Sequence, residues 1–258
     1  MALSGTQIEE LAAEFQRAGY LHLPRVVDAS ALTELSRQLL AEYRRARHAG
    51  ELFSAGGTIS GHLNCFPGAG ARFVFEQVRD FGVLSVVRRL SDQAVRMPNV
   101  GCNLNLPGSH AQNLHVDGYA ATPFMVVNIA AVDTTLINGA MEACPGSHRR
   151  DHKYWEFVLA RYPSVRLPLA VGDVVIRVST LWHRGMPNRS DSARPMLALS
   201  WEDGGSTLDD PYTAHAGAIR FFPNRYGTNL AGELKERAFA ALPGLGSGYR
   251  FLRSILES

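Results

Sequence analysis

Two histidines and an aspartate have the residue types and spacing of a metal site. His115 and Asp117 are separated by one residue, and His183 follows 66 residues after Asp117. In an extended segment, residues i and i+2 project from the same face, so the imidazole and the carboxylate point to one place while Val116 turns into the core. Alone, such a triplet is more commonly a solvated loop or a hydrogen-bonded pair. A histidine from a distant strand completes two histidines and one carboxylate, the set expected for non-haem Fe(II), whose other coordination positions stay open.

The residues that follow His183 favour the metal-site interpretation. Arg194 lies eleven residues after His183, enough for a strand end, a turn and the start of a returning strand. A guanidinium at that place binds a carboxylate through two parallel hydrogen bonds, and it stays charged at any working pH. A metal site and a site for an acidic ligand are therefore expected side by side.

With these residues in view, the sequence resembles the phytanoyl-CoA dioxygenase-like (PhyH) family of Fe(II)/2-oxoglutarate-dependent oxygenases. The resemblance covers roughly residues 100–202, where several motifs occur in the family's order and at its spacings. These motifs are His115-x-Asp117, the segment GAMEACPGSH at 139–148, Gly172-Asp173, His183, Asn188-x-Ser190 and Arg194. The family implies a mainly β protein with flanking helices, built on a double-stranded β-helix (jelly roll, cupin-like). His148 belongs by resemblance to a structural loop and not to the ligands.

The resemblance also implies a reaction and its cofactors. His115, Asp117 and His183 are expected to hold Fe(II), with 2-oxoglutarate on two further positions and O2 on the last. Arg194 is expected to pair with the distal 5-carboxylate of 2-oxoglutarate, which is converted to succinate and CO2. Hydroxylation is the default outcome, and desaturation, cyclisation or epimerisation use the same oxidant. Halogenation is disfavoured, because halogenating relatives carry Gly or Ala at the position of Asp117.

Several polar residues are weaker candidates for the remaining contacts. The expected cosubstrate-lining residues are Asn103, Asn105, Gln112 and Asn128, and the expected substrate-binding residues are His62, Asn64 and Trp201. A buried amide needs partners, so Asn128 either contacts the cosubstrate or bonds neighbouring backbone. Gly185 departs from the family, because some members place a hydroxyl there to assist the arginine. Support for the 5-carboxylate must then come from elsewhere.

Short strands separated by Gly, Pro, Asn and Asp predict the antiparallel sandwich or barrel that positions these residues. Residues 100–106 alternate between apolar and polar, which predicts one polar face lining a pocket. Further strands are expected at 20–24, 123–132, 140–144, 174–178, 195–201 and 219–223. Helices are expected from a Thr6–Glu9 capping box to Gly19, from Asp28 or Ser30 to Gly50, and at 81–91, 151–161 and 230–242.

Residues 54–71 differ from the rest of the chain in carrying five glycines and an isolated polar pair, His62 and Asn64. So many glycines disfavour a regular helix. The segment is predicted to be either a mobile lid over the substrate or a plain surface connection. Together with the helices before residue 99 it forms the first part of one expected oxygenase domain, 1–258. The jelly-roll core at 99–202 and a C-terminal loop and helix at 203–258 complete that domain.

The composition excludes several other classes of protein. A net charge of +2, with 46% hydrophobic and 19% charged residues, gives no sign of nucleic-acid binding. Three cysteines without metal-type spacing are expected to be buried thiols, and neither a signal peptide nor a membrane span is indicated, so the protein is expected in the cytoplasm.

A monomer or homodimer acting on a partly polar small molecule or natural-product intermediate is expected. The rival hypotheses are a non-catalytic metal-binding jelly roll and a redox-neutral cupin-like isomerase.

Overall fold

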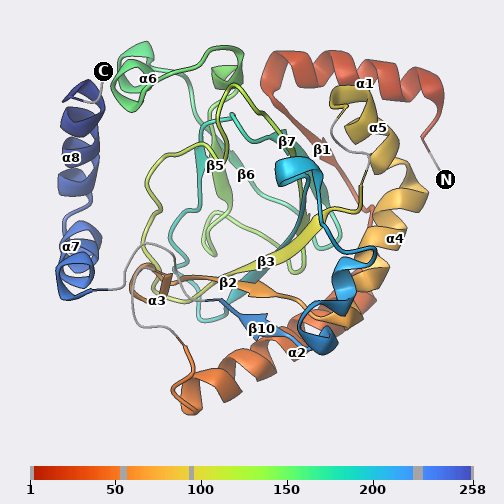
Figure 1. Ribbon diagram of the computed structural model, residues 1–258, viewed down its shortest axis with the longest axis horizontal. Coiled ribbons are helices and arrows are strands. Elements are labelled where there is room, and N and C mark those ends of the chain that lie inside the picture. Colours follow the sequence, from red (N-terminus) through yellow and green to blue (C-terminus); the bar gives the residue numbers. More distant parts are fainter. Residues whose placement is uncertain (1–2, 53–56, 93–95, 223–228, 257–258) are drawn as a thin grey trace.

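Two antiparallel sheets lie at the centre of the molecule (Figure 1). The computed structural model describes residues 3–52, 57–92, 96–222 and 229–256, and all statements below concern these. The larger sheet has the order β1-β7-β4-β9-β3-β2-β10 and is open, and the smaller has the order β6-β5-β8. The strands of the larger sheet are β1 (Tyr20–Leu23), β2 (His62–Phe66), β3 (Asn99–Asn105), β4 (Met125–Ala130), β7 (Val174–Val178), β9 (Arg194–Ser200) and β10 (Arg220–Phe221). Those of the smaller are β5 (Met141–Ala143), β6 (Val165–Leu167) and β8 (His183–Arg184).

The helices flank these sheets in two groups. Figure 1 shows α1, α2, α4 and α5 around one side and α6, α7 and α8 on the opposite side. Their bounds are α1 (Gly5–Ala18), α2 (Ala29–His48), α3 (Gly57–Ser60), α4 (Arg72–Phe81), α5 (Val83–Leu90), α6 (Tyr154–Ala160), α7 (Leu230–Ala241) and α8 (Pro243–Leu256). Short 3-10 helices are η1 (Ala69–Ala71), η2 (Ser147–Arg149), η3 (Glu202–Gly204) and η4 (Pro211–Gly217). No helix in the described part of the chain is both long and apolar enough to cross a membrane.

The two faces of the larger sheet have different chemistry, as the alternation in β3 predicts. Leu104 on β3, Leu197 on β9 and Ile176 on β7 point to one face, and the last two belong to the main apolar core with residues of α1, α2, α4 and α5. On the other face, Ala130, Val175 and Met196 pack against the smaller sheet. The helices therefore cover the outer face, and the inner face lies against β5 and β6.

The inner face collects the polar candidates in rows across the strands. Residues directly opposite on neighbouring strands share a face. The register places His62, Asn105 and Arg194 in one row across β2, β3 and β9. Asn64 and Asn103 lie in the next row. Because the apolar side chains of β2, β3 and β9 are buried under the helices, the polar side chains between them project from the inner face.

Helix boundaries differ from the expectation in three places. The capping box of α1 is Ser4 with Gln7, which bond each other's backbone N–H groups, and not Thr6 with Glu9. The same Ser/Thr-x-x-Glu/Gln pattern occurs twice there, and the helix begins at the earlier copy. An unexpected helix, α4, precedes α5, and Gly82 separates them at a φ of +98°. The C-terminal helix α8 was also not expected.

The expectation of an irregular loop at 54–71 is wrong for the residues that the structure describes. Residues 57–60 form α3, residues 62–66 form β2 and residues 69–71 form η1, while 53–56 lie outside the described residues. β2 pairs with β3 on one side and β10 on the other, so it is an integral strand and not a lid. Gly61 and Gly68, at φ values of +78° and +85°, occupy the left-handed region at the two ends of the strand. The glycines permit turns at both ends, and pairing with β3 and β10 stabilises the short strand between them.

Candidate metal centre

The His-x-Asp segment is held in an extended conformation by the chain around His183. His115 and His183 form an isolated antiparallel bridge in which each backbone N–H donates to the other's carbonyl oxygen at 3.0 Å. The backbone N–H of Asp117 donates to the Ser179 carbonyl oxygen at 2.8 Å. Val116 turns the other way and packs against the cluster of Cys144, Phe157 and Trp182. The expected alternation is therefore present.

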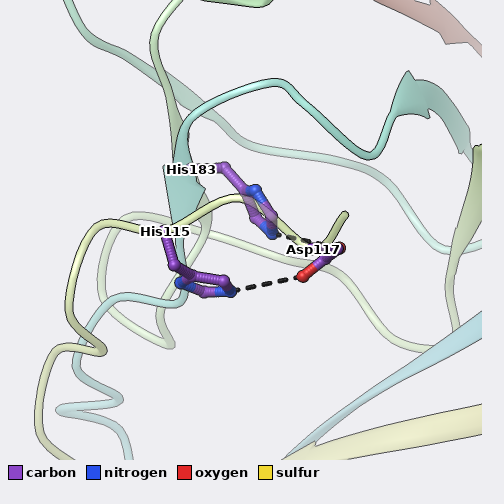
Figure 2. A group of neighbouring side chains, drawn as sticks. All are labelled: His115, Asp117 and His183. Atoms are coloured by element: carbon purple, nitrogen blue, oxygen red, sulfur yellow. Dashed lines mark ion pairs between the residues drawn. The ribbon is translucent and has the colours of Figure 1, made fainter. Parts of the chain in front are cut away.

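Three ligand atoms converge from these two segments, as Figure 2 shows. One ligand atom from each of His115, Asp117 and His183 lies within 4.8 Å of the other two. The His115 Nε2 atom is 3.4 Å from the Asp117 Oδ1 atom, and the His183 Nε2 atom is 3.6 Å from the Asp117 Oδ2 atom. No other such cluster of histidine, cysteine and acidic residues was found among the described residues.

Both imidazole rings are oriented for a metal by their second nitrogen. The Nδ1 atom of His115 lies 2.7 Å from the Asn113 carbonyl oxygen, and that of His183 lies 2.9 Å from the Leu181 carbonyl oxygen. A carbonyl oxygen only accepts, so each neutral ring carries its proton on Nδ1 and keeps the Nε2 lone pair free. A histidine ligand held in this way is typical of metal sites. The donor set therefore fits a divalent metal such as Fe(II).

The electrostatics keep the ligands in their metal-binding forms. Burial, with a further contribution from Arg177, lowers the pKa of His183 to about 3, so its ring is neutral at physiological pH. Burial alone raises the pKa of the Asp117 carboxyl, but Arg177 and the two histidines outweigh it and hold that pKa well below its ordinary value. A neutral imidazole and an ionised carboxylate are the forms that bind a metal.

Arg177 is a residue of the site that the sequence analysis missed. It lies on β7 and is buried, and its Nη2 atom is 2.6 Å from the Asp117 Oδ2 atom. Its Nε–H group donates to the Asn128 Oδ1 atom at 3.0 Å. The available signal was a single charged residue inside the otherwise apolar run 174–178, because a buried charge is rare without a specific partner.

Arg194 is buried at the start of β9, and no hydrogen bond or ion pair of its guanidinium is found within the described part of the chain. Its Nε atom is buried and has no hydrogen-bond partner there. Burial lowers the pKa of Arg194 to about 10, so it still carries its charge at neutral pH. A buried charge without a partner is costly. The side chain therefore fits an acidic ligand such as the 5-carboxylate of 2-oxoglutarate.

The turn that leads to Arg194 is built by the Asn188-x-Ser190 motif. The Asn188 Oδ1 atom accepts from the Ser190 backbone N–H at 3.0 Å, and its Nδ2 atom donates to the Ser192 carbonyl oxygen at 2.8 Å. The Nδ2 atom also donates to the Asn105 carbonyl oxygen at 3.1 Å, which joins this turn to β3. The buried amide thus sets the register in which β9 begins.

The space beside Gly185 is already filled, which accounts for the absence of a side chain there. A Cβ atom on Gly185 would lie 2.8 Å from the Gln112 Oε1 atom and 2.8 Å from the His62 Cε1 atom. Gln112 bonds the Gly185 backbone in both directions, through its own N–H and through Oε1. A hydroxyl side chain would clash with both. Gln112 and His62 occupy the place that a side chain on residue 185 would take.

The other candidates divide between the site and its scaffold. Asn103 is half-buried and Asn64 exposed on the inner face, and their amides bond each other at 3.0 Å. Asn105 is fully buried and its amide is bonded to the Met186 carbonyl oxygen and the Ser109 hydroxyl. Asn128 is bonded to Arg177, as described above. Trp201 lies in the helix-side core and its indole N–H donates to the Arg96 carbonyl oxygen, so the structure does not bring it to the inner face.

The burial of His62 predicts an acid-sensitive stability. Burial, reinforced by the charge of Arg194, lowers the pKa of His62 to about 4. The unfolded chain, with an ordinary pKa near 6.5, then binds more protons than the folded chain between pH 6.5 and 4. The free energy of unfolding therefore falls as the pH drops through this window, by up to about 3 kcal/mol from this residue.

We expect the His62→Gln protein to lose part of that acid sensitivity. Glutamine keeps an N–H donor for the His110 carbonyl oxygen, which the His62 Nε2 atom bonds at 2.9 Å, but it does not titrate. Urea unfolding of the metal-free proteins at several pH values between 4 and 7 measures the effect. Equal pH dependence in both proteins would contradict it, and His48→Gln, at the exposed C-terminal end of α2, is the matched control.

The fold and the site together define a class: a jelly roll with a two-histidine, one-carboxylate metal site beside a buried arginine. The sequence profile of the family described as phytanoyl-CoA dioxygenase (PhyH) matches residues 15–196. The chain belongs to this family. The expectation of an Fe(II)/2-oxoglutarate-dependent dioxygenase is thereby confirmed at the level of class.

Three solved structures with the same fold are similar to this chain. The chain is 23% identical to SnoN, a non-haem α-ketoglutarate-dependent epimerase from nogalamycin biosynthesis, with a TM-score of 0.57 over 76% of this chain and 83% of that chain. It is 20% identical to SnoK, a carbocyclase from the same biosynthesis, with a TM-score of 0.56 over 77% and 83%. It is 16% identical to HygX from Streptomyces hygroscopicus with nickel and 2-oxoglutarate bound, with a TM-score of 0.55 over 78% and 87%. The jelly-roll expectation is confirmed.

Proposed function

We propose that this protein hydroxylates a partly polar small molecule, a natural-product intermediate, with Fe(II) and 2-oxoglutarate. The observation that carries the proposal is Arg194, a buried guanidinium without an acidic partner among the described residues, on the sheet face that also presents Arg177 to the metal ligand Asp117. A structural metal site has no need of such a residue. A dicarboxylate cosubstrate accounts for a metal site together with the unpaired Arg194. One of its carboxylates would bind the metal, and the other would pair with the Arg194 guanidinium.

The chain's own residues bind and orient the reactants. His115, Asp117 and His183 would hold the iron, and Arg194 would fix the distal carboxylate and so the direction of the cosubstrate. When bound, iron and 2-oxoglutarate activate O2 so that one oxygen atom enters a C–H bond of the substrate and the other enters succinate, with release of CO2. The protein's contribution is to place the C–H bond and to exclude competing reactions.

Side chains on the inner face of the larger sheet and in the loop of Asp117 support this substrate class. Asn64 and Asn103 continue the inner face beyond the row of His62 and Arg194, and Tyr119, in the same loop as Asp117, is exposed. Amides and a phenol suit hydroxyl and carbonyl groups of a substrate with some apolar surface. The similarity to SnoN and SnoK, both from nogalamycin biosynthesis, supports a natural-product intermediate. They also make epimerisation and ring closure the principal alternatives, since both begin with the same removal of hydrogen.

The decisive measurement is succinate formation that depends on a substrate. The Fe(II)-loaded protein is mixed with 2-oxoglutarate, oxygen and one candidate metabolite at a time, and succinate and product are followed by mass spectrometry. We expect one succinate per product, with the product heavier by one oxygen atom. A product lighter by two hydrogens indicates ring closure or desaturation, and a product of unchanged mass indicates epimerisation. If 2-oxoglutarate neither binds nor decays under any condition, the proposal fails in favour of a non-catalytic or redox-neutral metal protein.

A further inference from the structure

We propose that Arg177, held by Asn128, keeps Asp117 on the metal through a single oxygen and so keeps a coordination position open for the cosubstrate. The proposal deepens the function proposed above and rests on it. Arg177 is a charged residue that contacts Asp117, and it is not among the residues expected to bind the metal or the cosubstrate.

One oxygen of the Asp117 carboxylate, Oδ2, is already bonded to Arg177. The Arg177 Nη2 atom lies 2.6 Å from the Asp117 Oδ2 atom, a short charge-assisted hydrogen bond. The Oδ1 atom lies on the side of His115, 3.4 Å from its Nε2 atom, and pairs with no lysine or arginine among the described residues. A carboxylate binds metals through one oxygen or through both. With Oδ2 engaged, Oδ1 is the oxygen left for the metal.

Arg177 cannot readily release that oxygen, because both residues that position it lie in strands. Only 6% of Arg177 is exposed, and its Nε–H group is bonded to the Asn128 Oδ1 atom. Arg177 lies on β7 and Asn128 on the neighbouring β4, in adjacent rows of the same face. Moving the guanidinium would break its bonds to Asp117 and Asn128 and leave a buried charge unpaired. The free energy lost in this way is typically larger than that gained from a new ion pair at the exposed surface.

A cation beside Asp117 favours binding of the anionic cosubstrate and disfavours binding of the metal. A positive charge beside a divalent metal repels it, so a neutral amide would serve the metal better. The same charge favours an anion arriving at the metal. The Nη1 atom of Arg177 is buried without a hydrogen-bond partner, and it is bonded to the same carbon as Nη2. It therefore offers a donor beside Asp117 to a carboxylate that takes the open position.

The test uses Mn(II) as a spectroscopic probe and the variant Arg177→Met. Removing the guanidinium frees Oδ2 to bind the metal as well, which closes one of three open positions. We expect Mn(II) affinity to stay within about 10-fold, because the lost orientation is offset by the lost repulsion. The relaxation of bulk water protons by bound Mn(II) should fall by about a third, one exchangeable water of three. The affinity of the Mn(II)-loaded protein for 2-oxoglutarate should fall by about 10- to 100-fold.

Controls separate this proposal from the proposed function. Arg166→Met removes a half-buried arginine of β6 that bonds the Ala140 carbonyl oxygen, and it should change none of the three quantities. If 2-oxoglutarate displaces no water from the wild-type Mn(II) site, the proposed function fails. If the wild type behaves as expected but Arg177→Met keeps the wild-type relaxation and cosubstrate affinity, only the role of Arg177 is overturned.

A second pair of variants covers the case in which Arg177→Met does not fold. Arg177→Lys keeps the charge but cannot bond Asp117 and Asn128 together, and Asn128→Ala leaves the guanidinium without its brace. Both should lower the water relaxation and the cosubstrate affinity in the same direction as Arg177→Met, by smaller factors. Wild-type values in both variants would overturn the proposal, as would a loss of Mn(II) affinity with unchanged cosubstrate affinity at saturating metal.

Discussion

Replacing His183 with alanine is expected to abolish iron binding at micromolar protein and, with it, all turnover of 2-oxoglutarate. The ring is buried and is one of the three candidate ligands, and the described residues offer no other histidine or acidic group in the cluster to replace it. Loss of a ligand is a larger change than loss of a group that orients one, so the metal affinity should fall by more than about 100-fold. Anaerobic titration with Fe(II), followed by metal analysis after desalting, measures it.

The matched control for this prediction is His148→Ala. His148 lies on η2 and packs against Phe15 and Gly19, outside the three-ligand cluster. It should retain iron at the wild-type level. Full iron occupancy in the His183→Ala protein would refute the ligand assignment, and His110 and His148 would then have to be tested as ligands.

Replacing Arg194 with methionine is expected to weaken 2-oxoglutarate binding by at least about 30-fold without a comparable loss of iron. Removing one partner of a buried, charge-assisted pair costs about 2–5 kcal/mol, because the ligand's carboxylate is left unpaired. Methionine fills a similar volume, so the result does not report a cavity. The measurement is a titration of the anaerobic Fe(II) protein with 2-oxoglutarate, followed by its charge-transfer absorption. Arg189→Met, an exposed arginine five residues away, is the control and should bind normally.

The same variant separates a functional arginine from a structural one. In the protein without cosubstrate, Arg194 is a buried charge that no described residue pairs with, so an apolar replacement should leave the free energy of unfolding unchanged or raise it. A residue kept for the fold would behave in the opposite way. If Arg194→Met lowers the stability strongly and leaves the cosubstrate titration unchanged, the 5-carboxylate must be bound elsewhere, and Arg184 becomes the next residue to test.

The sequence by itself predicted that His115 and Asp117 point to one place, because that depends on local spacing. His115 and Asp117 share a face whenever the backbone between them is extended, and the structure has that backbone bridged to His183. The alternation at 100–106 likewise decided which face of β3 is polar, since the period of a strand is two. These features need no knowledge of what lies opposite. The distance between Arg194 and His183 in the chain was informative for the same reason.

Only the tertiary structure decided which polar side chains are free and which are already bonded. Asn103, Asn105 and Asn128 look alike in the sequence, yet one is bonded to Asn64, one to the 186 backbone and Ser109, and one to Arg177. Arg177 escaped notice because its partner Asp117 is 60 residues away in the chain, on another segment. Residues 62–66 read as part of a glycine-rich loop, because a strand this short is stabilised by its two neighbours and not by its own propensity. A side chain's partners depend on strand register across the sheet, and register is set by the burial of the whole outer face under its helices.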